Sequence, residues 1–151
     1  MVLLILCGLI VTASAQPQIS KQNNKICLKN GRLTKEFHFS ETFPAPIRVL
    51  LRSKAMQKNI LDTQIDQPLF EFCINNTLLR GSEPVWKYKN HHIRHLQNQG
   101  LELELIFTTA KPSVKGLELG FYQQIFSNTT MIREKLELRT VGTTQLHLNK
   151  C

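Results

Sequence analysis

The stretch Leu101-Glu102-Leu103-Glu104-Leu105-Ile106-Phe107 alternates apolar and charged side chains with a period of two through most of its length. Such a period predicts a β-strand with one buried face, because successive side chains of a strand point to opposite sides of the sheet. The apolar side chains at positions 101, 103, 105 and 107 are expected to face a core. The glutamates at 102 and 104 are expected to lie on a solvated face.

Similar but shorter segments occur on both sides of this strand. We expect strands around residues 37–39, 47–51, 69–74, 117–122, 135–141 and 145–148, and a connection over residues 108–116. One helix is expected over residues 53–61, where apolar residues have roughly helical spacing. Several short strands with frequent connections favour an all-β fold, an antiparallel β-sandwich.

The chain begins with an apolar segment that has the form of a cleavable signal peptide. An apolar run from Val2 to Val11 is followed by Ala13-Ser14-Ala15, the pattern of small residues that a signal peptidase requires. The run is shorter than the roughly 20 apolar residues that span a bilayer. We therefore expect a signal peptide over residues 1–15, a flexible N-terminal lead over 16–26 and a single β-sandwich domain over 27–151. The mature protein is expected to be secreted and extracellular, with no transmembrane segment.

The charge balance bears on the partners of a secreted protein. The 151 residues contain 19 Lys and Arg against 11 Asp and Glu, which gives a net charge of +8. Such a protein is drawn to anionic surfaces, such as sulfated glycans, phospholipid headgroups or acidic proteins. Secretion makes nucleic acid an unexpected partner. The alternative is that the charge only aids solubility.

Secretion also changes what the cysteines predict. Cys7 lies in the signal peptide, so the mature chain retains Cys27, Cys73 and Cys151. An oxidising compartment favours a disulfide between two of them, and the sequence leaves the pairing open. Cys151 is either the odd thiol, available for a disulfide-linked homodimer, or an internal partner that ties down the terminus.

Two sequons suit the same compartment. Asn75-Asn76-Thr77 and Asn128-Thr129-Thr130 both lack Pro at the middle position. Each is therefore a competent acceptor for an N-linked glycan if it is exposed. We predict glycosylation at Asn75 and Asn128.

Residues 98–122 combine an alternating strand that ends at Phe107, a short connection that contains Ser113, and a strand that follows Gly116 and ends in Phe121-Tyr122. This hairpin resembles the final hairpin of CUB domains. The resemblance implies a divergent CUB-like extracellular sandwich that binds proteins or glycans. The chain departs from that family because Cys27 and Cys73 have no near partners and the acidic calcium-binding cluster has no counterpart.

Residues 86–95 form the densest polar and aromatic stretch of the chain. The basic side chains suit an anionic ligand, and the aromatic rings offer flat faces to a sugar or a headgroup. Three histidines in the stretch would strengthen such binding below about pH 6.5. The alternative is a solvated basic strand whose aromatic rings belong to the core. The predicted ligand-binding residues are Trp86, Lys87, Tyr88, Lys89 and Arg94.

The sequence contains none of the common catalytic motifs. It has no Gly-x-Ser-x-Gly elbow, no His-Glu-x-x-His helix and no glycine-rich phosphate loop. His91 and His95 are the best candidates for metal ligands, but no local carboxylate or cysteine completes a site. We therefore predict no enzymatic activity, no cofactor and no metal site.

Extracellular recognition is the function that these features favour. The first prediction is a secreted glycoprotein that acts as an extracellular binding module for a protein or an acidic glycan. The alternative is a small secreted effector, such as a cytokine-like ligand or an enzyme inhibitor, in the form of a disulfide-linked dimer.

Overall fold

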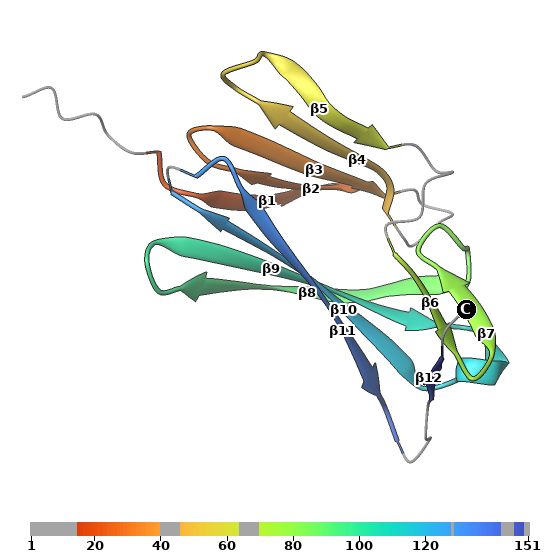
Figure 1. Cartoon of the computed structure of the whole chain (residues 1–151). Coiled ribbons are helices and arrows are strands. Elements are labelled where there is room, and N and C mark those ends of the chain that lie inside the picture. The colour runs from red at the N-terminus through yellow and green to blue at the C-terminus, as the bar shows by residue number, and fades with distance from the viewer. Residues whose placement is uncertain (1–14, 40–45, 64–69, 128, 143–146, 150–151) are drawn as a thin grey trace, which may run out of the picture.

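The computed structural model is nearly all β, and every strand pair is antiparallel, which confirms the predicted fold class. It describes residues 15–39, 46–63, 70–127, 129–142 and 147–149. The strands form three sheets, which Figure 1 shows as an upper layer, a lower layer and a smaller unit beside one end of the lower layer.

The first two sheets are meanders, in which consecutive strands are neighbours. The five-stranded sheet has the order β1-β2-β3-β4-β5, with β1 (Gln18–Gln22), β2 (Lys25–Lys29), β3 (Leu33–Phe39), β4 (Pro46–Ser53) and β5 (Lys58–Thr63). The four-stranded sheet has the order β11-β10-β9-β8, with β8 (Trp86–Leu96), β9 (Gly100–Thr109), β10 (Leu117–Phe126) and β11 (Ile132–Thr140). A 3-10 turn over Pro112–Val114 lies within the connection between β9 and β10.

The hydrophobic core lies between these two sheets. Leu103, Leu105 and Phe107 project from β9 as their alternation predicts, and all three are buried. They join Ile26 and Phe37 of the five-stranded sheet in one apolar cluster. Removal of this apolar surface from water is the main force that holds the two layers together.

A three-stranded sheet closes one end of this core. It has the order β12-β6-β7, with β6 (Glu71–Ile74), β7 (Thr77–Arg80) and β12 (Leu148–Asn149). The ring of Trp86 packs edge-on against Phe70 at a centroid distance of 5.3 Å, and its Nε1 donates a hydrogen bond to the carbonyl of Arg80 at 2.9 Å. The buried indole therefore joins the start of β8 to the three-stranded sheet.

The predicted helix over residues 53–61 is wrong. β4 ends at Ser53, a turn follows, and β5 begins at Lys58 and pairs with β4. Met56 and Ile60, two of the apolar residues that suggested the helix, are exposed. The segment forms a hairpin because strand pairing satisfies its backbone, whereas a short helix depends on packing of its apolar face.

The expected flexible lead over residues 16–26 contains β1 and the start of β2. β1 pairs with β2 in five consecutive register positions, from Gln18 opposite Lys29 to Gln22 opposite Lys25. Its side chains are mostly exposed, so no apolar pattern marked it as a strand. Backbone hydrogen bonds to β2 hold it in place instead.

The other terminal predictions lie partly outside the described residues. These include residues 1–14 of the predicted signal peptide and residues 145 and 146 of the last predicted strand. Within the described part of the chain, no helix is long and apolar enough to cross a membrane.

Candidate functional site

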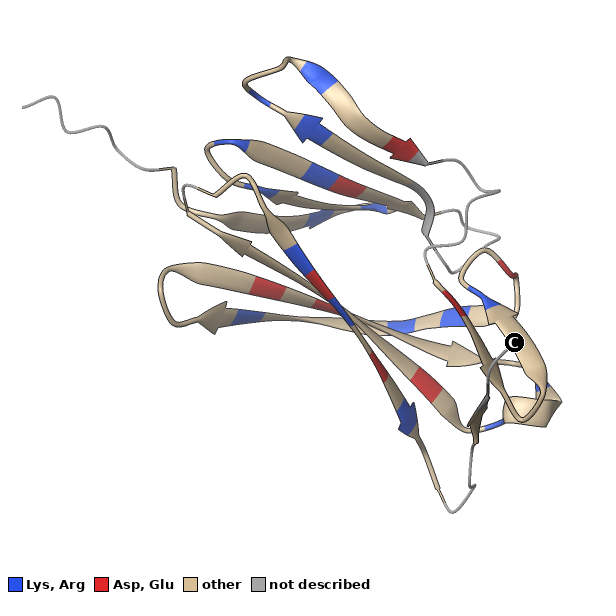
Figure 2. Cartoon of the chain, in the orientation of Figure 1, with Lys and Arg blue, Asp and Glu red and all other residues tan. Residues whose placement is uncertain are grey.

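The outer face of the four-stranded sheet carries an ordered array of charged side chains. The register places Tyr122 of β10 between Lys135 of β11 and Glu104 of β9. The next row on this face places Gln124 between Arg133 and Glu102. Figure 2 shows acidic positions on the inner strands β9 and β10, basic positions along the edge strand β8, and both basic and acidic positions along the edge strand β11. We call this surface the cationic face and define it by its basic residues Lys87, Lys89, Arg94, Arg133, Lys135 and Arg139.

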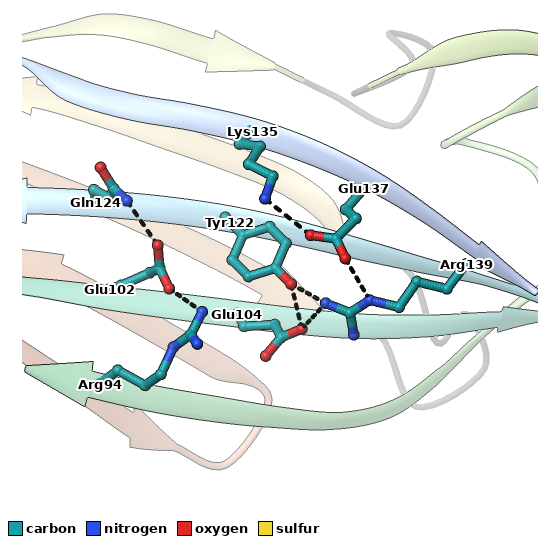
Figure 3. Close-up of polar contacts among 8 residues, drawn as sticks. All are labelled: Arg94, Glu102, Glu104, Tyr122, Gln124, Lys135, Glu137 and Arg139. Atoms are coloured by element: carbon teal, nitrogen blue, oxygen red, sulfur yellow. Dashed lines mark hydrogen bonds and ion pairs between the residues drawn. The ribbon is translucent and has the colours of Figure 1, made fainter.

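The centre of the cationic face is a cluster around Glu104. The hydroxyl of Tyr122 and the Nη2 of Arg139 each donate a hydrogen bond to its Oε1 at 2.8 Å (Figure 3). Burial alone would raise the pKa of Glu104, but these two bonds outweigh it and hold the pKa below its ordinary value. The pKa of Tyr122 is raised by burial and by its bond to Glu104. Glu104 is therefore a carboxylate at neutral pH, and Tyr122 keeps its proton.

Glu137 extends this cluster along β11. It accepts a bond from Lys135 Nζ at 2.9 Å and one from Arg139 Nε at 2.8 Å, as Figure 3 shows. These two donors lower the pKa of Glu137 to about 2. Lys135 Nζ also lies 4.7 Å from the centroid of the Tyr122 ring, within cation–π range. The ring of Tyr122 thus lies beneath basic side chains rather than open to solvent.

A second cluster surrounds Glu102. It accepts hydrogen bonds from the guanidinium of Arg94 and, at 2.7 Å, from Gln124 Nε2 (Figure 3). Lys89 forms a similar ion pair with Glu118 nearer the other end of the sheet. Each of these carboxylates on an inner strand is thus covered by a basic side chain from an edge strand.

Exposure of this face is unequal between the carboxylates of the inner strands and the basic side chains of the edge strands, whereas Glu137 on β11 is 36% exposed, close to Arg139 at 35%. The side chains of Glu102 and Glu104 are 8% and 9% exposed. The side chains of Arg94 and Lys135 are 58% and 64% exposed. A ligand that approached this face would therefore meet mainly ammonium and guanidinium groups, although the face also contains several carboxylates.

The structure separates the predicted ligand-binding residues into two groups. Lys87, Lys89 and Arg94 belong to the cationic face. Trp86 is fully buried, and the ring of Tyr88 packs against Phe107 of the core. The aromatic rings therefore belong to the core, as the alternative interpretation expected, and the exposed part of the predicted site is its basic half.

The three histidines of β8 do not share one face. His92 lies opposite Glu104 on the outer face, whereas His91 and His95 lie opposite Leu105 and Leu101 on the inner side. The pKa of His91 is lowered by burial and then by the nearby charge of Lys21. His92 is thus the one of the three histidines that lies on the cationic face.

The sequence did not single out the basic residues of β11. The signal was present, since Arg133, Lys135 and Arg139 alternate with Ile132, Leu136 and Leu138. What the sequence did not show was that β11 lies beside β10, and that Arg139 therefore reaches Glu104, which lies 35 residues away in the sequence.

The predicted modification sites are only partly described. Cys27 and Cys73 are free thiols, and burial raises the pKa of Cys27. Asn75 is exposed in the β6–β7 turn, and its Oδ1 accepts a bond from the backbone N–H of His147 at 2.9 Å. Cys151 and Asn128 lie outside the described residues. The disulfide and the glycans stay predictions.

Two observations on the described residues bear on small ligands. No group of three or more His, Cys, Asp and Glu side chains among them is placed to hold a metal. A shallow depression of about 350 Å³ lies at the end of the sheet that carries the β10–β11 loop. Its lining has no carboxylate and no imidazole: it consists of Asn98, Phe126, Ser127, Thr129, Met131 and Arg133.

Comparison of the chain with protein-family models, with curated protein sequences and with solved structures finds no significant match. The resemblance of residues 98–122 to CUB domains thus stays a prediction, and the candidate site is argued from its own geometry.

Proposed function

We propose that this protein is a secreted, glycosylated binding module that recognises acidic glycans through the cationic face. The unequal exposure of the two charge signs carries the proposal. The side chains of Glu102 and Glu104 are buried, while those of their partners Arg94 and Arg139 are 58% and 35% exposed. The predicted signal peptide places this surface where sulfated glycans are abundant ligands.

The shape of the face favours an extended polyanion. The two edge strands β8 and β11 are separated by β9 and β10, so their rows of basic residues lie about 14 Å apart at the usual strand spacing. Binding of a polyanion to such rows releases its condensed counterions, which supplies much of the affinity. Flat cationic rows can bind several sulfates at once without a deep pocket.

Heparin affinity tests the proposal. The test variant combines Lys87→Gln, Lys89→Gln and Arg94→Gln, which removes the basic row of β8. We expect the wild-type protein to be retained on heparin at physiological salt and the variant to elute at clearly lower salt. The slope of log affinity against log salt should fall by about two to three, close to one for each ionic contact removed.

A matched control separates a specific face from net charge. Lys29→Gln, Lys54→Gln and Lys58→Gln remove the same charge from exposed lysines of the five-stranded sheet and its β4–β5 turn. This control should elute close to the wild type. Equal weakening of both triple variants, or a wild type that passes through the column, would overturn the proposal. Circular dichroism should verify that all three proteins keep the same fold.

A further inference from the structure

The edge strand β11 differs from the other long edges of the molecule. Its ladder with β10 runs through nine consecutive register pairs, from Leu117 opposite Thr140 to Ile125 opposite Ile132, without a shift. The β8 ladder is interrupted by a bulge between Tyr88 and Asn90. The ladder of edge strand β5 shifts between Leu51 and Arg52, and the edge strand β1 has only five residues. Bulges, short lengths and charged side chains protect edges from pairing with other chains. β11 has neither a bulge nor a short length, so its charged side chains decide which strand can pair with it.

β11 also carries apolar side chains that the second sheet does not cover. Leu136 and Leu138 lie opposite Phe121 and Leu119 on the core side of the sheet. The β10 partners are 2% and 0% exposed, whereas Leu136 and Leu138 are 42% and 37% exposed. The core therefore ends at β10 along this half of the sheet, and two leucines of β11 remain in water.

The central charges of β11 are complementary to a second copy of the same strand. When residues 132–140 of one copy pair antiparallel with the same nine residues of a second copy, Leu136 lies at the twofold axis. Lys135 of one copy then lies opposite Glu137 of the other, and this contact occurs twice. An axis at Glu137 would place Glu137 opposite Glu137 and Lys135 opposite Arg139. An axis at Lys135 would place Lys135 opposite Lys135, although Arg133 would then face Glu137, and either shift would pair only seven residues instead of nine. Like charges directly opposite one another destabilise a sheet, and an axis at Leu136 avoids them at and beside the axis while it pairs all nine residues.

We propose that two copies of this protein associate through β11 to form a homodimer with a continuous eight-stranded sheet. The interface pairs the backbones of residues 132–140 and places Leu136 against Leu136 of the second copy. Arg133 lies opposite Arg139 of the second copy, whose charge is compensated by Glu104 and Glu137 of its own chain. Edge pairing of this kind obtains affinity from main-chain hydrogen bonds and specificity from side chains.

The proposed dimer goes beyond the proposed function and does not depend on it. The two cationic faces would lie side by side on one sheet. This would double the extent, measured across the strands, of the surface offered to a polyanion. Association itself requires no glycan. Its test is therefore made without heparin, so that failure of the dimer and failure of glycan binding are separate results.

Sedimentation velocity over a range of concentrations measures this association. The whole chain is produced in a secretory host, and its thiols are reduced and alkylated so that no disulfide can link two copies. We expect a reversible monomer–dimer equilibrium. Leu136→Lys places like charges at the twofold axis and should raise the dissociation constant about 10- to 100-fold. The control is Ile93→Lys, on the core side of the opposite edge strand with 44% exposure, and it should leave the constant unchanged.

Charge exchange between two variants tests the register. Lys135→Glu and Glu137→Lys each place like charges opposite one another in their own homodimers, and each should weaken association about tenfold. Mixing the two variants restores opposite charges at both contacts, so the mixture should form a heterodimer with nearly wild-type affinity. Circular dichroism would show whether a variant has lost its fold. A wild type that stays monomeric overturns the proposal, as does a dimer that none of the β11 substitutions weakens.

Discussion

The two faces of the four-stranded sheet are both largely shielded from water, but by different means. On the inner face, Leu103 and Leu105 are covered by a second sheet. On the outer face, the side chains of Glu102 and Glu104 are only 8% and 9% exposed, although none of the sheets in the described part of the chain covers them. Long basic side chains and Tyr122, from neighbouring strands of the same sheet, cover these carboxylates.

This difference shows that one alternating strand can be stabilised by two kinds of contact. The inner contacts are apolar and non-directional, and their strength follows the buried area. The outer contacts are ion pairs and hydrogen bonds, which contribute less to stability because their groups lose water on pairing. We therefore expect the inner face to determine how stable the fold is and the outer face to determine what it binds.

The largest expected effect is at the centre of the inner face. Leu105→Ala should lower the free energy of unfolding by about 3 kcal/mol, because it removes a fully buried side chain and leaves a cavity. Guanidinium denaturation measures the change. The control Leu136→Ala, on the same side of the sheet but exposed, should cost under about 1 kcal/mol in the monomer. Equal losses would contradict the idea that the core ends at β10.

A smaller effect is expected where the inner face is polar. Lys35 projects from β3 into the core, donates a hydrogen bond to Gln123 Oε1 at 2.7 Å and pairs with Glu134 of β11. Burial lowers the pKa of Lys35. Lys35→Met should lower the free energy of unfolding by about 2 kcal/mol, because it leaves the buried oxygen of Gln123 without a donor.

A double variant distinguishes the lost hydrogen bond from altered packing. Lys35→Met combined with Gln123→Leu replaces both partners by apolar groups of similar size, and most of the lost stability should return. Thermal or chemical denaturation of the two single variants and the double variant forms a double-mutant cycle. If their effects simply add, this polar contact does not link the two sheets.

The smallest effect is expected on the outer face. Glu104→Gln keeps the shape of the side chain but replaces charge-assisted bonds by neutral ones, which should cost about 1 kcal/mol at pH 7. The pKa of Glu104 is lower in the folded state than in the unfolded chain. Its contribution is therefore fully present above the ordinary carboxyl pKa of about 4.3 and is lost as the pH falls below it. Denaturation curves from pH 7 to pH 3 should show a shallower acid-side decline for the variant, and a parallel decline in both proteins would contradict the assigned network.

The fold class could be predicted from the sequence, and the reason lies in particular residues. Leu103 and Leu105 face the core and Glu102 and Glu104 face away from it, as the alternation of β9 predicts. The expectation that these glutamates are solvated was wrong, because basic side chains and Tyr122 from neighbouring strands bury them. The prediction failed where that alternation was weak. β1 has almost no buried side chain, and the residues that suggested a helix over 53–61 form a hairpin with exposed Met56 and Ile60. In both segments strand pairing decided the structure.

The candidate site was predicted only in part. Lys87, Lys89 and Arg94 lie on the cationic face, whereas the rings of Trp86 and Tyr88 point into the core. Composition alone could not separate these two groups. The basic residues of β11 could be read from their own alternation, but their position beside β10 could not, because sequence distance says nothing about which strand lies there.

The sequence by itself determined which side chains share a face, because the pleat of a strand turns successive residues to opposite sides wherever the strand lies. Only the tertiary structure decided which faces meet and which remain open. The order β11-β10-β9-β8 brings Arg139 to Glu104 and leaves the leucines of β11 at an uncovered edge. Strand order depends on contacts between residues far apart in the chain, and the local pattern of one strand does not encode them.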